Sequence, residues 1–550
     1  MGRTRWLPFA IVSLLAAAPY LLTPGFAFVF DDRHLIVDNP FLRDHASLLT
    51  AFAHHFWHGT RYGAAYYRPM VVASFALNGL LLGWGPAGFH LVNILLHAGN
   101  AMLLLALTRR VGCPDPAALA AAALFAVHPV AAWPVASVVA RVDLLPAFFV
   151  LLAWLRLCPQ AKGSSRVIEG PTHAGGWRAV MAGLFFLLAL LSKESSVAFL
   201  AVPILGLRPM REQDAARSHR WIGAPLAAAV LIYLMLRRMA GLGLRVDPLL
   251  IDPLINPLSA LPIAQRLPAA VMLCGRYLLY LLFPVRFHDP SNYLDPASLP
   301  GPLDSGVLLS LLVLLVSTAM VAVLWLRRDR TAVPLAFSIA SFLPASNLIV
   351  PIASLYAQNF LYLPLIGLCL ALGIAIGRAS PARLRPTPAK LLAAFLLLGA
   401  LATASCREAR IWKDEVSLFG ALSARFPCYA PAHSALGVAL LDRGRSREAV
   451  GPLRKALALT DASLEAHYNL GVALILTARD RAGQEEALAH LHRSVELRPG
   501  FAPAHYQAAR ALLLLGQDAQ AESEAREAAR LDPDLAAEVK RLFGDRERRP

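Results

Sequence analysis

The chain has 550 residues, of which 57% are hydrophobic and only 16% charged, and its formal net charge is +16. Apolar runs of about 15 to 25 residues recur as far as residue 405 and then stop, which excludes an ordinary soluble protein and indicates a polytopic membrane protein with a soluble tail. The tail, residues 411–550, is neutral with 19 basic and 19 acidic residues, so the positive excess belongs to the membrane part, where cytoplasmic loops account for it. We therefore expect a lipid bilayer, and no nucleic acid, among the partners.

The first apolar run, residues 7–28, follows a basic flank and is long enough to span a bilayer. We interpret it as a retained anchor whose N-terminus lies inside. Asp31 and Asp32 follow where this helix leaves the membrane on the far side. Ionisable groups at such a depth are costly, which favours a functional role, although adjacent acids also cap helix exits.

The membrane domain is predicted to cover residues 1–405 with about 11 to 13 spans. Its first extracytoplasmic loop, residues 29–87, is predicted to carry helices in the membrane interface. Counting spans from the two ends of the domain disagrees by one crossing between residues 178 and 268, so that crossing stays open. The predicted spans are 7–28, 88–108, 116–135, 144–158, 178–192, 195–208, 221–237, 267–284, 305–326, 332–350, 359–377 and 389–405.

Charged residues of both signs fall on the predicted outer face. Asp31 and Asp32 are candidates for a general base that takes the proton of an acceptor hydroxyl. The candidates for holding a phosphate are Arg68, Arg141 and Lys193, where arginine offers a bidentate fork and lysine a point charge. A hydroxyl that attacks a sugar–phosphate bond needs both a base and positive charge at the departing phosphate.

Two further carboxylates accompany these cations. Asp143 and Glu194 are candidates for orienting them or for binding a divalent metal, although no metal-ligand spacing appears in the chain. The alternative is purely structural: Arg141 with Asp143 would close a tight turn, and Lys193 with Glu194 would neutralise each other at a helix kink. No nucleotide-binding glycine loop appears, and no other cofactor motif does, which suits transfer from a preactivated donor.

The tail repeats itself. Its three units open on Ala-His pairs spaced by 34 and then 38 residues, at Ala432-His433, Ala466-His467 and Ala504-His505. Leu-Gly and alanine positions that follow match a tetratricopeptide repeat, so we expect an all-α solenoid that binds a peptide or protein. We place a linker and half repeat at 406–430, three repeats at 431–535 and a basic C-terminal tail at 536–550.

Short motifs recur in a fixed order along nearly the whole chain: Phe30-Asp31-Asp32, Tyr67-Arg68-Pro69, Gly88-Phe89-His90-Leu91-Val92-Asn93, Leu96-His97, His128-Pro129, Ala140-Arg141-Val142-Asp143-Leu144-Leu145, Leu191-Ser192-Lys193-Glu194-Ser195, Leu343-Pro344-Ala345-Ser346-Asn347-Leu348 and Tyr362-Leu363-Pro364. With these motifs the chain resembles one family, the transmembrane and tetratricopeptide-repeat O-mannosyltransferases and their bacterial relatives, within the GT-C glycosyltransferases. One departure is Ala357-Gln358-Asn359-Phe360, which stands where relatives have an acidic-basic-aromatic run.

The resemblance implies a polytopic, all-α GT-C-type bundle that transfers a sugar, such as mannose, from a polyprenyl-phosphate carrier to a hydroxyl of a protein acceptor. It implies Asp31 as the base with Asp32 as its partner, Asp143 as a second-loop acid, and Arg141 and Lys193 as phosphate contacts. It also implies a multi-pass protein of the bacterial inner membrane with extracytoplasmic repeats that present acceptors. The alternatives are a non-enzymatic, membrane-anchored repeat scaffold for envelope assembly and a transporter of lipid-linked sugars.

Overall fold

The structure is a computed structural model that describes residues 6–60, 66–158, 175–206, 212–243, 253, 255–284, 299–352, 354–378 and 387–544. Within these ranges the chain is helical and contains no β-strand, as the apolar patterning predicted. The described residues divide into two compact units that meet in sequence between Asp414 and Glu415. The predicted all-α architecture, a membrane bundle followed by a helical repeat array, is confirmed.

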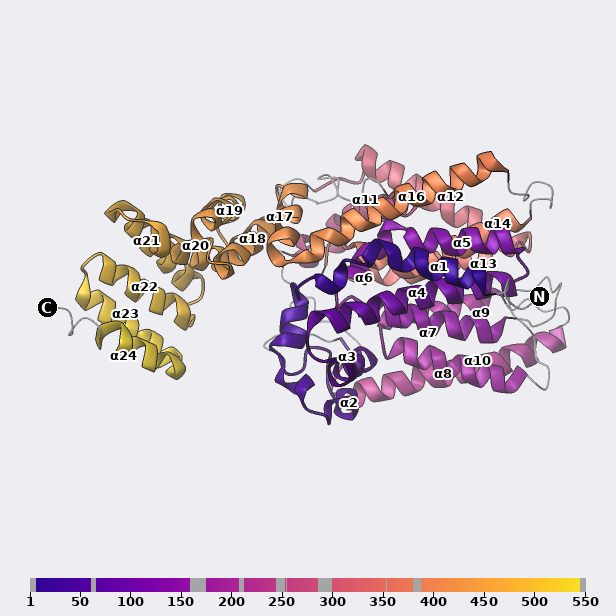
Figure 1. Cartoon of the computed structure of the whole chain (residues 1–550), viewed down its shortest axis with the longest axis horizontal. Helices are drawn as coiled ribbons and strands as arrows, with labels where there is room; N and C mark the ends of the chain where they lie inside the picture. The colour runs from indigo at the N-terminus through magenta and orange to yellow at the C-terminus, as the bar shows by residue number, and fades with distance from the viewer. Residues whose placement is uncertain are drawn as a thin grey trace. The chain divides into compact units, whose positions relative to one another are not determined.

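The first unit is a bundle whose long helices lie side by side, with the short first-loop helices α2 and α3 at one end (Figure 1). Its helices are α1 (Leu7–Ala17), α2 (Ser47–Thr50), α3 (Pro69–Leu82), α4 (Pro86–Arg110), α5 (Asp115–Val127), α6 (Ala132–Ala136), α7 (Arg141–Leu157), α8 (Gly175–Leu190), α9 (Ala201–Gly206), α10 (Glu212–Met239), α11 (Ile263–Leu282), α12 (Ser305–Leu326), α13 (Ala332–Phe342), α14 (Tyr362–Gly377) and α16 (Pro388–Arg410).

Among the described residues, six helical segments are long and apolar enough to cross a membrane: Leu7–Gly25, Pro86–Arg110, Trp221–Met239, Ser305–Leu326, Gln358–Gly377 and Pro388–Lys413. A seventh, the predicted span 116–135, is two helices bent by 46° at Pro129. Proline causes the bend because its ring cannot donate the hydrogen bond that would continue the helix. The remaining predicted spans are helices too, but they are shorter or less apolar, and the region around the open crossing lies partly outside the described residues.

Helix α4 is the centre of the bundle, since it packs against α1, α5 and α7, while α7 packs against α8 and α8 against α10. Amide side chains along α4 reach across to the turn that begins α7. Asn93 donates to the Ser137 carbonyl over 2.9 Å, and Asn100 donates to the Leu144 carbonyl over 3.0 Å. Hydrogen bonds of this kind fix helix positions inside a bilayer, where apolar burial discriminates little between packings.

The second unit consists of paired antiparallel helices. Its helices are α17 (Glu415–Arg425), α18 (Ala430–Asp442), α19 (Ser446–Leu459), α20 (Leu464–Thr477), α21 (Arg481–Leu497), α22 (Ala502–Leu514), α23 (Asp518–Leu531) and α24 (Ala536–Gly544). The pairs α18/α19, α20/α21 and α22/α23 coincide with the three sequence repeats, and each pair packs on the next. Residues predicted as a basic tail form helix α24 up to Gly544, and the last six lie outside the described residues.

Glycine at the Leu-Gly position lets the two helices of a repeat approach closely. A Cβ added at Gly471 would lie 2.6 Å from the Leu491 Cγ, closer than packed atoms come, and 3.1 Å from the Ala487 carbonyl oxygen, which is a tight contact. We therefore expect Gly471→Val to destabilise the array by about 1–3 kcal/mol. Hydrogen exchange of the full chain would show faster exchange in α20 and α21, whereas Gly451→Val, where no heavy atom lies within 4 Å of the added Cβ, would change it little. Equal changes of hydrogen exchange in Gly471→Val and Gly451→Val would contradict the close packing at Gly471.

Candidate active site

The acidic pair follows a strained backbone position. Phe30 has φ +53°, in the left-handed region that a bulky residue rarely adopts. Directly after Asp32, residues Arg33–Val37 form a short π-helix instead of an α-helix. Such strain costs about 1–3 kcal/mol and persists where the surrounding structure enforces it, often at functional sites. The two features lie directly on either side of Asp31 and Asp32.

Asp32 is tied into the fold. Its side chain is fully buried, and its two carboxylate oxygens accept from the Val139 backbone N–H over 2.8 Å and from the Val29 backbone N–H over 3.2 Å. Val139 lies just before the first turn of α7, where the helix dipole favours a negative charge. Burial nevertheless raises the pKa of Asp32 to about 7, against the lowering effect of these two N–H donors. Asp32 therefore joins the first loop to the start of α7.

Asp31 differs from its neighbour, because its carboxylate is partly exposed and makes no hydrogen bond or ion pair within the part of the chain that the structure describes. Burial by the surrounding apolar groups raises the pKa of Asp31 to about 7. A carboxylate with such a pKa accepts a proton near neutral pH much more readily than an ordinary aspartate does. Of the two acids, Asp31 has the freedom and the proton affinity that a general base needs.

Arg141 is fully buried and makes five hydrogen bonds, as many as its side chain has N–H groups. Nε donates to Asn93 over 2.9 Å, one terminal nitrogen donates to the carbonyl and hydroxyl of Ser74, and the other donates to Asn78 and to the Phe89 carbonyl. The guanidinium also lies 4.9 Å from the centre of the Phe75 ring. The described neighbours thus use the whole hydrogen-bonding capacity of Arg141, which leaves none for a phosphate in this structure.

Lys193 and Asp143 form a buried ion pair. The sequence pattern had instead offered Glu194 as the partner of Lys193, and Arg141 as the partner of Asp143. The lysine ammonium contacts one carboxylate oxygen of Asp143, and Asn359 donates to the other oxygen over 2.8 Å. The Lys193 ammonium also lies 5.7 Å from the centre of the Phe360 ring. This contact brings together the first turn of α7, the break between α8 and α9, and the segment before α14.

Removing one member of this pair would leave a buried charge behind. We expect Lys193→Met to lower the free energy of unfolding by about 3 kcal/mol, and the double variant with Asp143→Asn to recover more than half of that loss. Thermal unfolding in detergent would measure both. The matched control is Arg378→Met, which breaks the more exposed Arg378–Asp329 pair and should cost at most about 1 kcal/mol. A double variant no more stable than Lys193→Met would contradict the pairing.

Arg68 and Glu194 form a second ion pair, with Arg68 Nε 3.2 Å from one carboxylate oxygen. The other oxygen accepts from the Tyr67 backbone N–H over 3.2 Å and lies 3.9 Å from a terminal nitrogen of Arg237. Burial alone would raise the pKa of Glu194, but Arg68, backbone donors and Arg237 together outweigh it and hold the pKa below its usual value. Two arginines therefore converge on one carboxylate.

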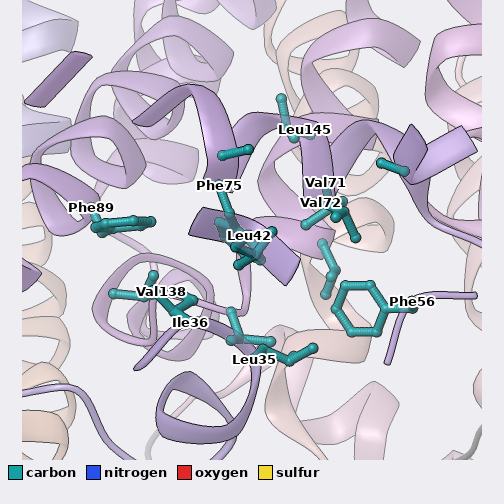
Figure 2. Packing of buried hydrophobic residues seen from close by; sticks show 14 residues of the cluster. Leu35, Ile36, Leu42, Phe56, Val71, Val72, Phe75, Phe89, Val138 and Leu145 are labelled. Atoms are coloured by element: carbon teal, nitrogen blue, oxygen red, sulfur yellow. The ribbon is translucent and has the colours of Figure 1, made fainter. Parts of the chain in front are cut away.

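One apolar cluster connects the first loop with the segments that carry Arg68 and Arg141. It joins Leu35 and Ile36 of the first loop to residues of α3 and α4 and to the segment that begins α7 (Figure 2). Val71, which lies three residues after Arg68, and Val142, which follows Arg141, both belong to it. The loop with the acids therefore shares a core with the segments of these two arginines.

Sequence reasoning missed two members of this site. Arg237 stands at the end of α10, where a predicted span gives way to a basic segment, and Asn359 belongs to the motif that departs from the family pattern. The arginine pair Arg237-Arg238 ends a predicted span, and a charged pair at such an end was the available signal. No group of three or more His, Cys, Asp or Glu side chains in the described ranges could hold a metal ion.

The fold and the site define a class: a multispanning membrane protein with a tetratricopeptide tail and a buried cluster of carboxylates and cations beside its first loop. Two curated proteins resemble the chain over most of its length. Protein O-mannosyl-transferase TMTC4 of Homo sapiens is 29% identical over 482 residues, 77% of this chain. Protein O-mannosyl-transferase Tmtc3 of Drosophila melanogaster is 27% identical over 536 residues, 84% of this chain. The chain is thus similar to the transmembrane and tetratricopeptide-repeat O-mannosyltransferases, the family that its motifs resemble.

These alignments cover only 62% and 56% of the two relatives, so the chain spans less than two thirds of their length. No protein-family model matches the sequence. Among solved structures, a thermophilic TPR protein of Thermus thermophilus matches 30% of this chain and 84% of its own at 23% identity, with a TM-score of 0.22. YrrB, a TPR protein with an unusual peptide-binding site, matches 28% of this chain and 83% of its own at 21% identity, with a TM-score of 0.21. We therefore assign the repeats from the chain's own helix pairs.

Proposed function

We propose that the protein is a membrane glycosyltransferase of the GT-C type, which moves a sugar, such as mannose, from a polyprenyl-phosphate carrier to a hydroxyl of a protein acceptor. The observation that carries this proposal is Asp31: a partly exposed carboxylate without a partner in the described structure, with a pKa raised to about 7. The relatives' printed names, which call them protein O-mannosyl-transferases, support the same class of reaction.

In the proposed reaction the acceptor oxygen attacks the anomeric carbon of the sugar. The bond from that carbon to the phosphate oxygen breaks, and the electron pair leaves with the polyprenyl phosphate. Asp31 takes the hydroxyl proton, so the acceptor attacks as a developing alkoxide and no free alkoxide has to form first. Asp32 holds the loop against α7 and so fixes the position of Asp31.

The departing phosphate needs positive charge, which the arginine and lysine side chains of the site supply. Arg68 is our first candidate, because its side chain is not fully buried as Arg141 is, and it is held between Glu194 and the Tyr66 ring, 4.4 Å from the ring centre. Lys193 is the second candidate, oriented by Asp143. Arg141 we assign to positioning, because its hydrogen bonds hold α3, α4 and α7 together. The carboxylates of Asp143 and Glu194 are both paired with cations, so they do not fit a divalent metal in this structure.

We assign the site to the extracytoplasmic side of the membrane, for a bacterial chain the inner membrane, because the first helix has a basic flank and the acids follow its other end. The repeat array would then present acceptor proteins on the same side. This assignment rests on the three helix pairs of the tail and on the general use of such arrays to bind peptides or proteins.

The test is transfer itself. The purified full-length chain would be reconstituted in liposomes with a polyprenyl-phosphate mannose labelled in the sugar, together with exported proteins of the source cell as acceptors. We expect label to become attached to serine or threonine of the acceptors. Release of label to water alone, or movement of intact donor across the bilayer without transfer, would contradict the proposal and favour a transporter. Binding of proteins by the tail without any use of the donor would favour a scaffold.

A further inference from the structure

Glu194 stands between two arginines that come from distant parts of the chain. Arg68 precedes α3, Arg237 ends α10, and both approach the same carboxylate, Arg68 Nε at 3.2 Å and a terminal nitrogen of Arg237 at 3.9 Å. Arg237 is held in place by its own Nε, which donates to the Gly243 carbonyl over 3.0 Å. The arrangement is what two guanidinium groups adopt around a bound anion.

The three side chains differ in exposure in a way that indicates which one can move. Glu194 keeps 32% of its side chain exposed, whereas Arg68 keeps 13% and Arg237 keeps 7%. Buried arginine side chains are fixed by their packing, here the Tyr66 ring beside Arg68 and Tyr233 one helical turn before Arg237. The carboxylate can therefore leave towards solvent while the two guanidinium groups stay.

Charge favours a replacement of this kind. Two arginines and one glutamate leave a net charge of +1 in a largely buried place, and a phosphate monoester or diester brings one to two negative charges with oxygens in the spacing that guanidinium groups bind in pairs. A glutamate side chain tethered to the protein is a weaker partner for two arginines than a phosphate with three or more oxygens. It is strong enough, however, to keep both guanidinium groups aligned when no phosphate is bound.

We propose that Glu194 occupies the phosphate subsite in the ligand-free protein, and that the phosphate of the lipid-linked donor displaces it and binds between Arg68 and Arg237. The inference rests on the proposed function for the identity of the donor, but the anion subsite itself does not depend on transfer. Arg237 becomes a second phosphate-binding arginine, and Glu194 a positioning residue that holds the site ready.

The experiment measures binding, not transfer. The probes are farnesyl phosphate, inorganic phosphate and the neutral alcohol farnesol, each titrated against the full-length chain in detergent. We expect Glu194→Gln to bind farnesyl phosphate about three- to tenfold more tightly than the unaltered protein, because the competing negative charge is gone. Glutamine can still accept the Tyr67 N–H bond, so the backbone contact survives the change.

The arginine variants should act in the opposite direction. Arg237→Gln is expected to weaken farnesyl phosphate binding at least tenfold, in line with the usual cost of losing one member of a buried, charged pair. The matched control is Arg238→Gln, the exposed neighbour in sequence, which should leave binding within twofold. Farnesol should bind equally to all variants. Inorganic phosphate that binds as tightly as farnesyl phosphate would identify the subsite as one for free phosphate, and would overturn the assignment to a lipid-linked donor.

Two results would overturn the proposal: Glu194→Gln that weakens binding as Arg237→Gln does, or Glu194→Gln that leaves it unchanged. Ligand-induced shifts of the unfolding temperature serve as the second measurement, so a less stable variant still gives an answer. Failure of the proposed function is distinguishable, because a chain that transfers no sugar but shows tighter phosphate binding in Glu194→Gln would keep the subsite and lose the reaction. Normal sugar transfer together with unchanged farnesyl phosphate binding in Glu194→Gln would support the proposed reaction and overturn the subsite.

Discussion

Asp31→Asn is expected to lower the rate of sugar transfer by a factor of about 10² to 10⁴, the usual cost of removing a positioned general base. Asparagine has nearly the same shape, and the Asp31 carboxylate makes no hydrogen bond within the described residues that the change would break. The variant should therefore insert, accumulate and bind farnesyl phosphate normally. Transfer of labelled sugar in liposomes is the measurement. The matched control is Asp38→Asn, an exposed acid of the same loop, which should keep full activity.

The pH dependence follows from the raised pKa of Asp31. A base with a pKa of about 7 is mostly protonated at pH 5.5, so kcat/KM for transfer should rise between pH 5.5 and 8 and level off above the pKa. The free energy of unfolding should fall, not rise, over the same pH range. A carboxyl group whose folded-state pKa lies above its unfolded value contributes most below the unfolded pKa, near 3.9, and loses that contribution as the pH rises through 7.

Asp31→Asn removes this loss, so it should raise the unfolding temperature at pH 8 by a few degrees and by much less at pH 4.5. Two outcomes would remove Asp31 from the mechanism: full activity of Asp31→Asn, or a reduced activity that keeps the unaltered protein's pH profile. A pH profile shared by Asp38→Asn and the unaltered protein would show that Asp38 contributes nothing to it.

Arg141→Met is expected to lower the free energy of unfolding by at least about 4 kcal/mol. The change leaves the acceptor oxygens of Asn93, Asn78, Ser74 and Phe89 without their donor, and each buried group left unsatisfied costs about 1–3 kcal/mol. Little folded protein should accumulate, as size-exclusion chromatography and thermal unfolding would show. Arg110→Met, which removes a side chain that donates to the Cys158 carbonyl, should cost about 1 kcal/mol.

Arg141→Lys separates the two roles that have been considered for this residue. Lysine keeps the charge but reaches fewer of the acceptors, so a partly destabilised protein should survive for binding measurements. If Arg141 only positions α3, α4 and α7, the surviving Arg141→Lys protein binds farnesyl phosphate as the unaltered protein does. A tenfold loss of binding in a folded Arg141→Lys protein would restore the phosphate contact that the sequence pattern predicted.

The architecture could be predicted because it depends on regular signals. Apolar runs predicted the bundle, and the Ala-His and Leu-Gly spacing predicted the three helix pairs. Among the described residues, α8, α9 and α13 are apolar but shorter than a full span, with a break around Lys193, so the number of 11 to 13 spans stays a prediction. Hydropathy reports apolar content, whereas the length of a helix depends on where its backbone hydrogen bonds end.

The candidate site was predictable in its residue types but not in its pairings. The sequence placed Asp143 next to Arg141 and Lys193 next to Glu194, whereas the structure pairs Lys193 with Asp143 and Glu194 with Arg68. Neighbours in sequence at the start of a helix point in different directions, so each of these side chains finds its partner on another segment. Arg237 and Asn359 could be connected to the site only through such long-range contacts.

The contacts around the start of α7 restrict how a substrate can enter. Asp32 accepts a hydrogen bond from Val139 in the turn before this helix. Asp143, four residues after Val139, contacts both Lys193 and Asn359. The first loop, the break after α8 and the segment before α14 are therefore all attached to the start of α7. A hinge at that turn would have to break several buried polar contacts at once. If the proposed lipid-linked donor binds here, its entry must depend on motion elsewhere, such as the proposed displacement of the Glu194 side chain.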